Sequence, residues 1–140
     1  MPLQMEIPAL QTFLEREFPQ VAADFHLEEV TEDRLILGLR VAERHLRPGG
    51  TVSGPTMFGL ADVAMYLAIL SHLGPVALAV TTNCSIDFLR KPEAGSDLRA
   101  EARLLKLGRS LAVGDVLLFS QGVAAPVARA GLTYSIPPKR

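Results

Sequence analysis

One acidic residue lies within a long apolar segment of this sequence. Asp62 is the only Asp, Glu, Lys or Arg between residues 55 and 73, a stretch dominated by Leu, Ala, Met, Val and Ile. A carboxylate in apolar surroundings must be paired, neutral, or directed into a cavity where it reacts. Such a group can act as a general base or as a nucleophile, although a purely structural hydrogen bond accounts for the pattern equally well.

A glycine precedes this aspartate by eight residues. Gly54 is followed by Pro55, which suits the first turn of a helix because its missing N–H would be unpaired there. Backbone N–H groups at a helix start can hold a carbonyl oxygen or an oxyanion. Eight residues make about two helical turns. We therefore expect the Gly54 N–H and the Asp62 carboxylate to flank one pocket.

The elements that must position these groups follow from hydrophobic periodicity. The helix that carries Asp62 is expected over residues 55–73, and because it is apolar nearly all round it should be buried on most faces. One sheet covers only one side of such a helix, so a second copy of the chain is expected on the other. The pattern also predicts a short amphipathic helix over 8–18 and strands over 25–31, 34–41, 76–90, 96–107, 110–120 and 127–136. This order indicates an α+β fold.

Length and composition exclude several classes. The 140 residues suit one domain, 1–140, with an N-terminal helical segment over 1–19, a core over 20–136 and a tail over 137–140. Hydrophobic residues make up 49% and the net charge is −1, which excludes a disordered chain and gives no basic surplus for nucleic acid or a membrane surface. The lone Cys84 and three widely spaced histidines predict neither a disulfide framework nor a metal site. No signal peptide or membrane-spanning segment is expected, so the protein is expected in the cytoplasm.

Residues 53–62, with the sequence SGPTMFGLAD, resemble a known motif. In hotdog-fold acyl-CoA thioesterases of the PaaI type, His-Gly-Gly enters a helix that carries Leu-Ala-Asp at this spacing. The resemblance extends over 81–88 and 102–109 and covers about residues 20–136. It implies a hotdog fold, in which a curved antiparallel sheet wraps a long central helix. It also implies a homodimer or homotetramer with its site at the subunit interface, and no cofactor beyond the coenzyme A of the substrate.

The resemblance assigns roles to three residues of the catalytic site. It implies that Asp62 is the general base or nucleophile, that the Gly54 N–H polarises the thioester carbonyl, and that Thr81, from the neighbouring subunit, orients water. The sequence departs from the motif, since Ser53 stands where the family has His and Pro55 where it has the second Gly. The missing His weighs against hotdog dehydratases and hydratases, whose chemistry needs it.

Other residues are expected to bind the substrate. Arg47, at a position near which the family often has Asn, and Ser53 are expected beside the reacting group. Phe58 and Tyr66 share the helix face of Asp62 and are expected to set the depth of the acyl pocket. Basic side chains in two turns are expected to lie together at one end of the sheet and to contact the phosphates of coenzyme A, Arg109 first among them. They are Arg90, Lys91, Lys106 and Arg109.

Three functions are compatible with these expectations. The favoured one is hydrolysis of an acyl-CoA thioester. The alternative is a non-catalytic module that binds acyl-CoA on the same fold, although a pure binder has no need of a carboxylate on an apolar face. The third is a dimerising scaffold in which Asp62 is merely hydrogen-bonded.

Overall fold

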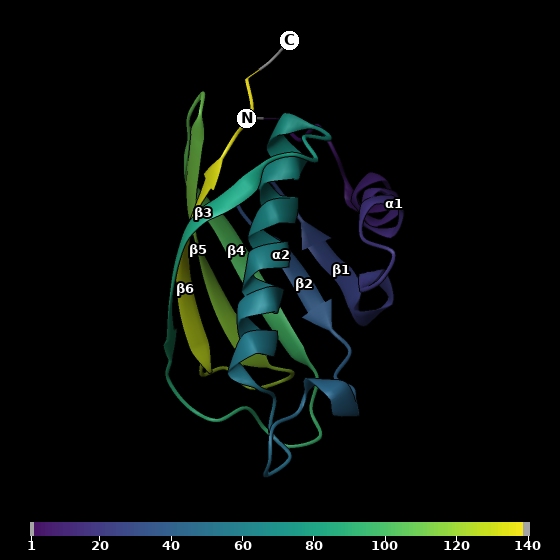
Figure 1. Ribbon diagram of the computed structural model, residues 1–140, viewed down its shortest axis with the longest axis vertical. Helices are drawn as coiled ribbons and strands as arrows, with labels where there is room; N and C mark the ends of the chain where they lie inside the picture. The colour runs from purple at the N-terminus through teal and green to yellow at the C-terminus, as the bar shows by residue number, and fades with distance from the viewer. Residues whose placement is uncertain (1, 139–140) are drawn as a thin grey trace.

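A long helix, α2 (Gly54–Leu73), lies along one face of a curved six-stranded sheet in the computed structural model, which describes residues 2–138 (Figure 1). The strand order is β1-β2-β4-β5-β6-β3, and all neighbouring pairs are antiparallel. This is the α+β hotdog architecture expected from the sequence. The strands are β1 (Phe25–Val30), β2 (Leu35–Leu39), β3 (Val80–Phe88), β4 (Leu98–Leu107), β5 (Leu111–Ser120) and β6 (Ala128–Ser135). The shorter helices are α1 (Ile7–Glu17), η1 (Ala22–Asp24) and η2 (Glu43–His45).

Helix α2 is the centre of the hydrophobic core. Its start is capped by Ser53, whose hydroxyl accepts a hydrogen bond from the Thr56 N–H at 3.3 Å. It ends at Gly74, where a φ of 90° favours glycine. Among the described residues, α2 is the one helix long and apolar enough to cross a membrane, but 61% of that stretch is buried inside the fold. It is therefore the buried core helix that its apolar pattern predicts.

Strand β5 passes close to α2 at Gly114. Gly114 is buried there, and a Cβ atom added to it would lie 2.3 Å from Met65 Cε of α2 and 2.6 Å from the Arg103 carbonyl oxygen of β4. The residues before and after it, Ala112, Val116 and Leu118, are buried on the same face at alternate positions. Glycine is thus required at this close contact between helix and sheet.

Strand β3 is shorter than its pattern predicts. The expected strand began at Val76, but the backbone turns there, with the Ala79 N–H donating to the Val76 carbonyl at 3.0 Å, and the strand begins at Val80. This turn redirects the chain from the end of α2 to the edge of the sheet. Among residues 2–138, β3 pairs with β6 alone, so its other edge has no neighbouring strand.

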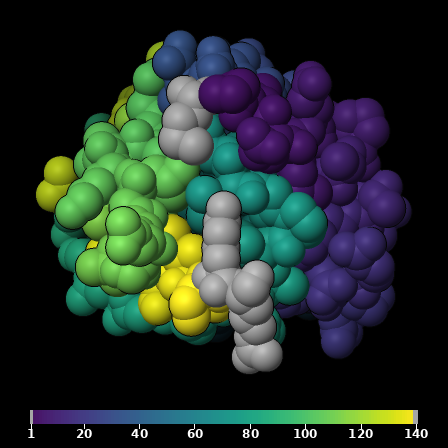
Figure 2. All heavy atoms as spheres, turned by 90° about the horizontal axis from the view of Figure 1, so that it is seen from above, coloured from purple at the N-terminus to yellow at the C-terminus, as the bar shows by residue number. Residues whose placement is uncertain are grey.

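The N-terminal segment packs against the far end of α2. The N–H groups of Gln4 and Met5 both donate to the Ser71 carbonyl, at 2.7 and 3.2 Å. Viewed from above, this purple segment and the green β4–β5 hairpin lie on opposite sides of the teal end of α2 (Figure 2). The aromatic rings of Phe13 and Tyr66, 6.2 Å apart, join α1 to α2.

Candidate active site

The Asp62 carboxylate is the centre of a hydrogen-bonded cluster. It is half-buried, and its Oδ1 atom accepts from the Thr81 hydroxyl at 2.5 Å and from the Tyr134 phenol at 2.7 Å. The Tyr134 hydroxyl also lies 3.0 Å from the carbonyl oxygen of Asp62 itself. Helix α2, the edge strand β3 and the inner strand β6 each contribute one of the three residues.

Sheet register explains why the two hydroxyls converge. Thr81 and Tyr134 are direct cross-strand partners of β3 and β6. Side chains opposite each other in an antiparallel pair project from the same face, here the face that packs on α2. The resemblance implied that Thr81 reaches the site from a neighbouring subunit. Within one chain, Thr81 already donates to Asp62, and a role for the partner's Thr81 in orienting water stays a prediction.

This cluster opens into a small, largely apolar cavity of about 210 Å³. Tyr66 lines it, as expected, and its hydroxyl donates to the Ala77 carbonyl at 3.0 Å. The Tyr66 ring stacks on Tyr134 with centroids 6.1 Å apart and meets the edge of Phe18 at 5.6 Å. Phe58 does not line this cavity within one chain and is 38% exposed. The full lining is Phe18, Asp62, Val63, Tyr66, Ala77, Ala79, Val80, Thr81 and Tyr134.

Gly54 lies in a different hollow, of about 440 Å³. The expectation that Gly54 and Asp62 flank one pocket is therefore wrong for a single chain. Their offset of eight residues places the two groups about 12 Å apart along the helix axis. Gly54 instead faces the ring of Phe88, which would be 3.3 Å from an added Cβ atom.

The backbone N–H of Gly54 is nevertheless available to a ligand. At the start of α2, the Ser53 N–H donates to the His45 carbonyl at 2.9 Å, the Thr56 N–H donates to the Ser53 hydroxyl, and Pro55 has none. Within residues 2–138, the Gly54 N–H is the one first-turn donor left without an acceptor. Ser53 lines neither hollow, because its side chain caps the helix.

The basic residues expected to bind the substrate divide into two groups. Arg47, Arg90 and Lys91 line the Gly54 hollow together with exposed Phe88. Arg109 lies in the turn between β4 and β5 and is not part of it. The expectation that all these turns meet at one end of the sheet is wrong, because β4 spans ten residues, about 33 Å, between them. Successive turns of an antiparallel meander lie at opposite ends of the strand they share.

Burial controls ionisation around the Asp62 cavity. It raises the pKa of Tyr134 well above the ordinary value of a phenol, and the nearby Asp62 carboxylate raises it further. Burial, with a contribution from Glu17, raises the pKa of Tyr66 to about 12. The pKa of the Cys84 thiol is raised by burial and by Asp62. Cys84 is thus held as a thiol, which favours the core role expected for it over that of a nucleophile.

These tyrosines predict a loss of stability in alkaline solution. An unfolded chain releases phenol protons near about pH 10, whereas the folded protein retains them. Their contribution to stability is complete below about pH 10 and is lost as the pH rises through the folded values, near 12 for Tyr66. The chain has two tyrosines and no tryptophan, so the ultraviolet absorbance of tyrosinate reports these two residues alone. We expect little tyrosinate at about pH 10 in the native protein, whereas ordinary phenols would be about half ionised there; ionisation of half or more would contradict the raised values.

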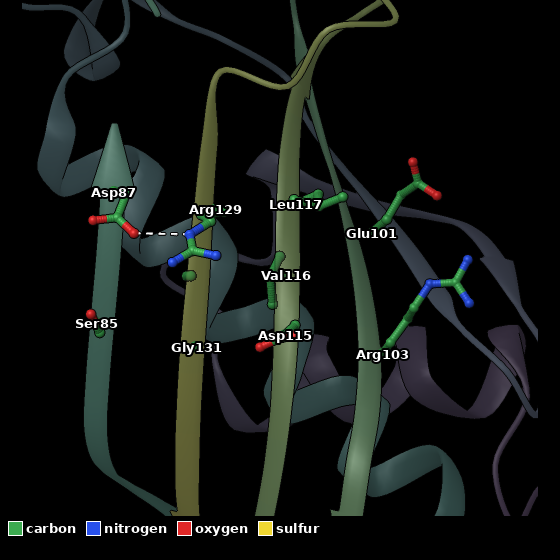
Figure 3. Close-up of a pocket in the computed structure, with 10 residues that line it drawn as sticks. Ser85, Asp87, Glu101, Arg103, Asp115, Val116, Leu117, Arg129 and Gly131 are labelled. Atoms are coloured by element: carbon green, nitrogen blue, oxygen red, sulfur yellow. Dashed lines mark hydrogen bonds and ion pairs between the residues drawn. The ribbon is translucent and has the colours of Figure 1, made fainter. Parts of the chain in front are cut away.

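A further hollow of about 380 Å³ lies on the face of the sheet opposite α2 (Figure 3). Asp87 points toward Arg129 there, and the two are paired at 2.9 Å. Gly131 leaves space at its floor, and the side chains around it are largely charged. Exposed, solvated charges of this kind gain little reactivity from their surroundings, so the chemistry is better placed on the α2 side. Within the described residues, no group of three or more His, Cys, Asp or Glu could hold a metal.

Tyr134 is a site residue that the sequence reasoning missed. Its position alternates with buried Ala130 and Leu132, which puts it on the inward face of the last strand. The pattern contains that information. What it does not contain is the pairing of β6 with β3, which sets Tyr134 beside Thr81.

Comparison with solved structures shows which proteins share this fold. A Silicibacter crystal structure named "putative thioesterase" is 59% identical, with a TM-score of 0.93 over 99% of this chain and 96% of that chain. A variant of the phenylacetic acid degradation protein PaaI from Thermus thermophilus is 28% identical, with a TM-score of 0.73 over 85% and 99%. A Streptococcus mutans protein solved with bound acetyl-CoA is 28% identical, with a TM-score of 0.72 over 83% and 90%.

The sequence also matches a family model directly. The model describes the thioesterase superfamily, and it matches residues 49–126, more than half of the chain. The matched stretch contains Asp62, Thr81 and the Gly54 helix start. Together with the hotdog fold and the PaaI relative, this match confirms the resemblance seen in the motif. The chain belongs to the thioesterase superfamily.

Proposed function

We propose that this protein hydrolyses an acyl-CoA thioester to a free acid and coenzyme A. The observation that carries the proposal is the Asp62 carboxylate, held by two hydroxyls at a small apolar cavity in a chain of this superfamily. Such a cavity suits an acyl group. A carboxylate beside it can take a proton from water or attack the thioester carbon. The reaction needs no metal or redox cofactor, and we place the enzyme in the cytoplasm.

The reaction balances with these groups alone. With Asp62 as general base, a water oxygen bonds to the thioester carbon while its proton passes to the carboxylate. The carbon–sulfur bond then breaks, and the proton is returned to the leaving thiolate of coenzyme A. With Asp62 as nucleophile, a carboxylate oxygen bonds to the thioester carbon as the carbon–sulfur bond breaks, which gives a mixed anhydride and the thiolate of coenzyme A. Water then cleaves the anhydride to the free acid, regenerates the Asp62 carboxylate and supplies the proton that the thiolate takes up. Thr81 can still accept a hydrogen bond from that water while it donates to Asp62.

A second copy of the chain would complete the site. In one chain the free Gly54 N–H and the Asp62 carboxylate lie in separate hollows. We infer that the Gly54 N–H of one protomer polarises the thioester carbonyl at the site that contains the Asp62 of its partner, so that each site uses two chains. The open edge of β3 and exposed apolar side chains at Phe58, Val80 and Phe88 support association there, at least as a dimer and in pairs as a tetramer.

The Gly54 hollow would then bind coenzyme A. Arg47, Arg90 and Lys91 supply positive charge for phosphates, and Phe88 and Leu89 supply apolar contact. The bound acetyl-CoA of the Streptococcus mutans relative supports this ligand class.

A panel of acyl-CoA substrates tests the proposal. Purified protein is assayed for release of the coenzyme A thiol from short-chain, medium-chain and aromatic acyl-CoAs, with an acyl pantetheine lacking the nucleotide as a comparison. We expect hydrolysis of at least one acyl class and a higher KM without the nucleotide. Binding across the whole panel without thiol release would contradict hydrolysis and favour the non-catalytic binding module.

A further inference from the structure

The two oxygens of the Asp62 carboxylate have different surroundings. Oδ1 accepts from both Thr81 and Tyr134, at 2.5 and 2.7 Å. For Oδ2, no hydrogen-bond partner is present among residues 2–138, although the residue lines the cavity. A carboxylate oxygen that already accepts two strong hydrogen bonds is a poor base. The oxygen left for chemistry is therefore Oδ2.

We propose that Tyr134 is a positioning residue, whose phenol fixes the Asp62 carboxylate so that Oδ2 faces the substrate. This inference rests on the proposed hydrolysis. The inference extends that proposal by naming Oδ2 as the reactive oxygen and Tyr134 as the residue that orients it. The Tyr134 ring lines the cavity proposed for the acyl group, but its hydroxyl contacts neither the attacking water nor the thioester carbonyl in this scheme and acts through Asp62.

The contacts of Tyr134 are suited to holding the Asp62 side chain in one orientation. Its hydroxyl reaches both the carbonyl and the side chain of Asp62, at 3.0 and 2.7 Å. A buried phenol needs only one acceptor to be satisfied. Contact with two atoms of one residue instead fixes the Asp62 side chain against its own backbone, which restricts rotation of the carboxylate.

Tyr134 is also the more rigid of the two donors. It is 3% exposed, and its ring stacks on Tyr66 within the core. Its strand, β6, lies between β5 and β3 and is hydrogen-bonded on both sides. Thr81 instead lies on the edge strand, next to an irregularity in register between Thr81 and Asn83. Placement of the carboxylate thus depends chiefly on the strand with two neighbours.

The ionisation of Tyr134 supports this role. Burial, with the charge of Asp62, raises its pKa above that of an ordinary phenol. The hydroxyl therefore keeps its proton, and donates it, across any pH at which the enzyme operates.

Kinetics of the Tyr134→Phe variant test the inference. Phe keeps the ring and its packing and removes only the hydroxyl. We expect kcat to fall about ten- to a hundredfold, the loss of one hydrogen bond to a charged group, while KM changes by no more than about twofold. A kcat within about twofold of wild type would overturn the positioning role.

The Ser71→Ala variant is the matched control. Ser71 is also buried on α2, and its hydroxyl donates to the Ala68 carbonyl at 2.6 Å, away from Asp62. The Ser71→Ala variant loses one buried hydrogen bond and leaves the hydrogen bonds of Asp62 unchanged. We expect a lower thermal stability with kcat close to wild type. An equal fall of kcat in both variants would show a merely structural effect and overturn the inference.

A crystal structure of the Tyr134→Phe variant separates this inference from the proposed function. We expect the Asp62 carboxylate to rotate or to occupy more than one orientation once the phenol is gone. A single, unchanged orientation would overturn the inference. If the wild-type protein hydrolyses no acyl-CoA, the proposed function fails, and this structure still decides whether Tyr134 holds Asp62.

Discussion

Replacing Asp62 with Asn is expected to lower the turnover of acyl-CoA by at least ~10²-fold, the scale of a lost general base. Asn has the same shape, and its carbonyl oxygen can still accept from Thr81 and Tyr134 where Oδ1 now accepts. It cannot take a proton from water or form a mixed anhydride. The loss should therefore fall on kcat, with folding and oligomeric state unchanged.

Thiol release under saturating substrate, together with the oligomeric state in solution, measures this result. Asp115→Asn is the matched control, because Asp115 is an exposed aspartate on the opposite face of the sheet. It removes the same charge without reaching the cavity, so its activity should stay near that of wild type. Near-normal activity of the Asp62→Asn variant on every acyl class would exclude catalysis by this carboxylate.

The second large effect is expected on stability, from replacing Gly114 with Ala. The added Cβ would lie 2.3 Å from Met65 Cε and 2.6 Å from the Arg103 carbonyl oxygen. The Met65 side chain can move, but the carbonyl belongs to a paired strand and cannot do so without shifting the sheet. Overpacking of this kind lowers the free energy of unfolding by about 1–3 kcal/mol. Because Met65 lies one turn beyond Asp62 on α2, activity should fall as well.

Gly131→Ala provides the comparison within the same sheet. Gly131 is on β6, and the nearest atom to its added Cβ would be Asp115 Oδ1 at 3.7 Å, an ordinary contact. Ala is a better strand residue than Gly, so this variant should be as stable as wild type or slightly more so. Denaturant unfolding at one fixed protein concentration measures both. Equal stability of the two variants would contradict a close contact at Gly114.

The sequence was a reliable guide wherever periodicity reports burial. The alternation of Leu98, Ala100, Ala102 and Leu104 against charged neighbours predicted a strand with one buried face. The first three are fully buried and Leu104 is half-buried. The apolar run around Asp62 likewise predicted the core helix and its bounds within one residue, since Gly54 begins it and Leu73 ends it. Residue spacing within one element was enough in both cases.

Relations between elements were harder to predict. Gly54 and Asp62 were expected in one pocket because they share a helix. Their spacing along the axis of α2, however, does not determine which hollow each residue faces. Arg90 and Arg109 were expected to lie together, but the direction of β4 separates them. The contact of Thr81 with Tyr134 depends on β6 inserting beside β3, out of chain order. Strand order is set by the packing of the whole sheet, and the pattern within any one strand does not specify it.

The place of β3 in the strand order also constrains how the site assembles as the chain folds. In the described part of the chain, β3 has one neighbour, β6, which follows it only after β4 and β5. β3 cannot pair into the sheet until β6 has docked. The chain segment between these two strands is long, so its closure costs more conformational entropy and is expected late in folding. Local unfolding of β3 likewise requires the loss of only one strand pairing. Opening the β3–β6 ladder releases Thr81 while the other strand pairs remain intact. Amide hydrogen exchange would detect this as a local opening at the site, of lower free energy than global unfolding.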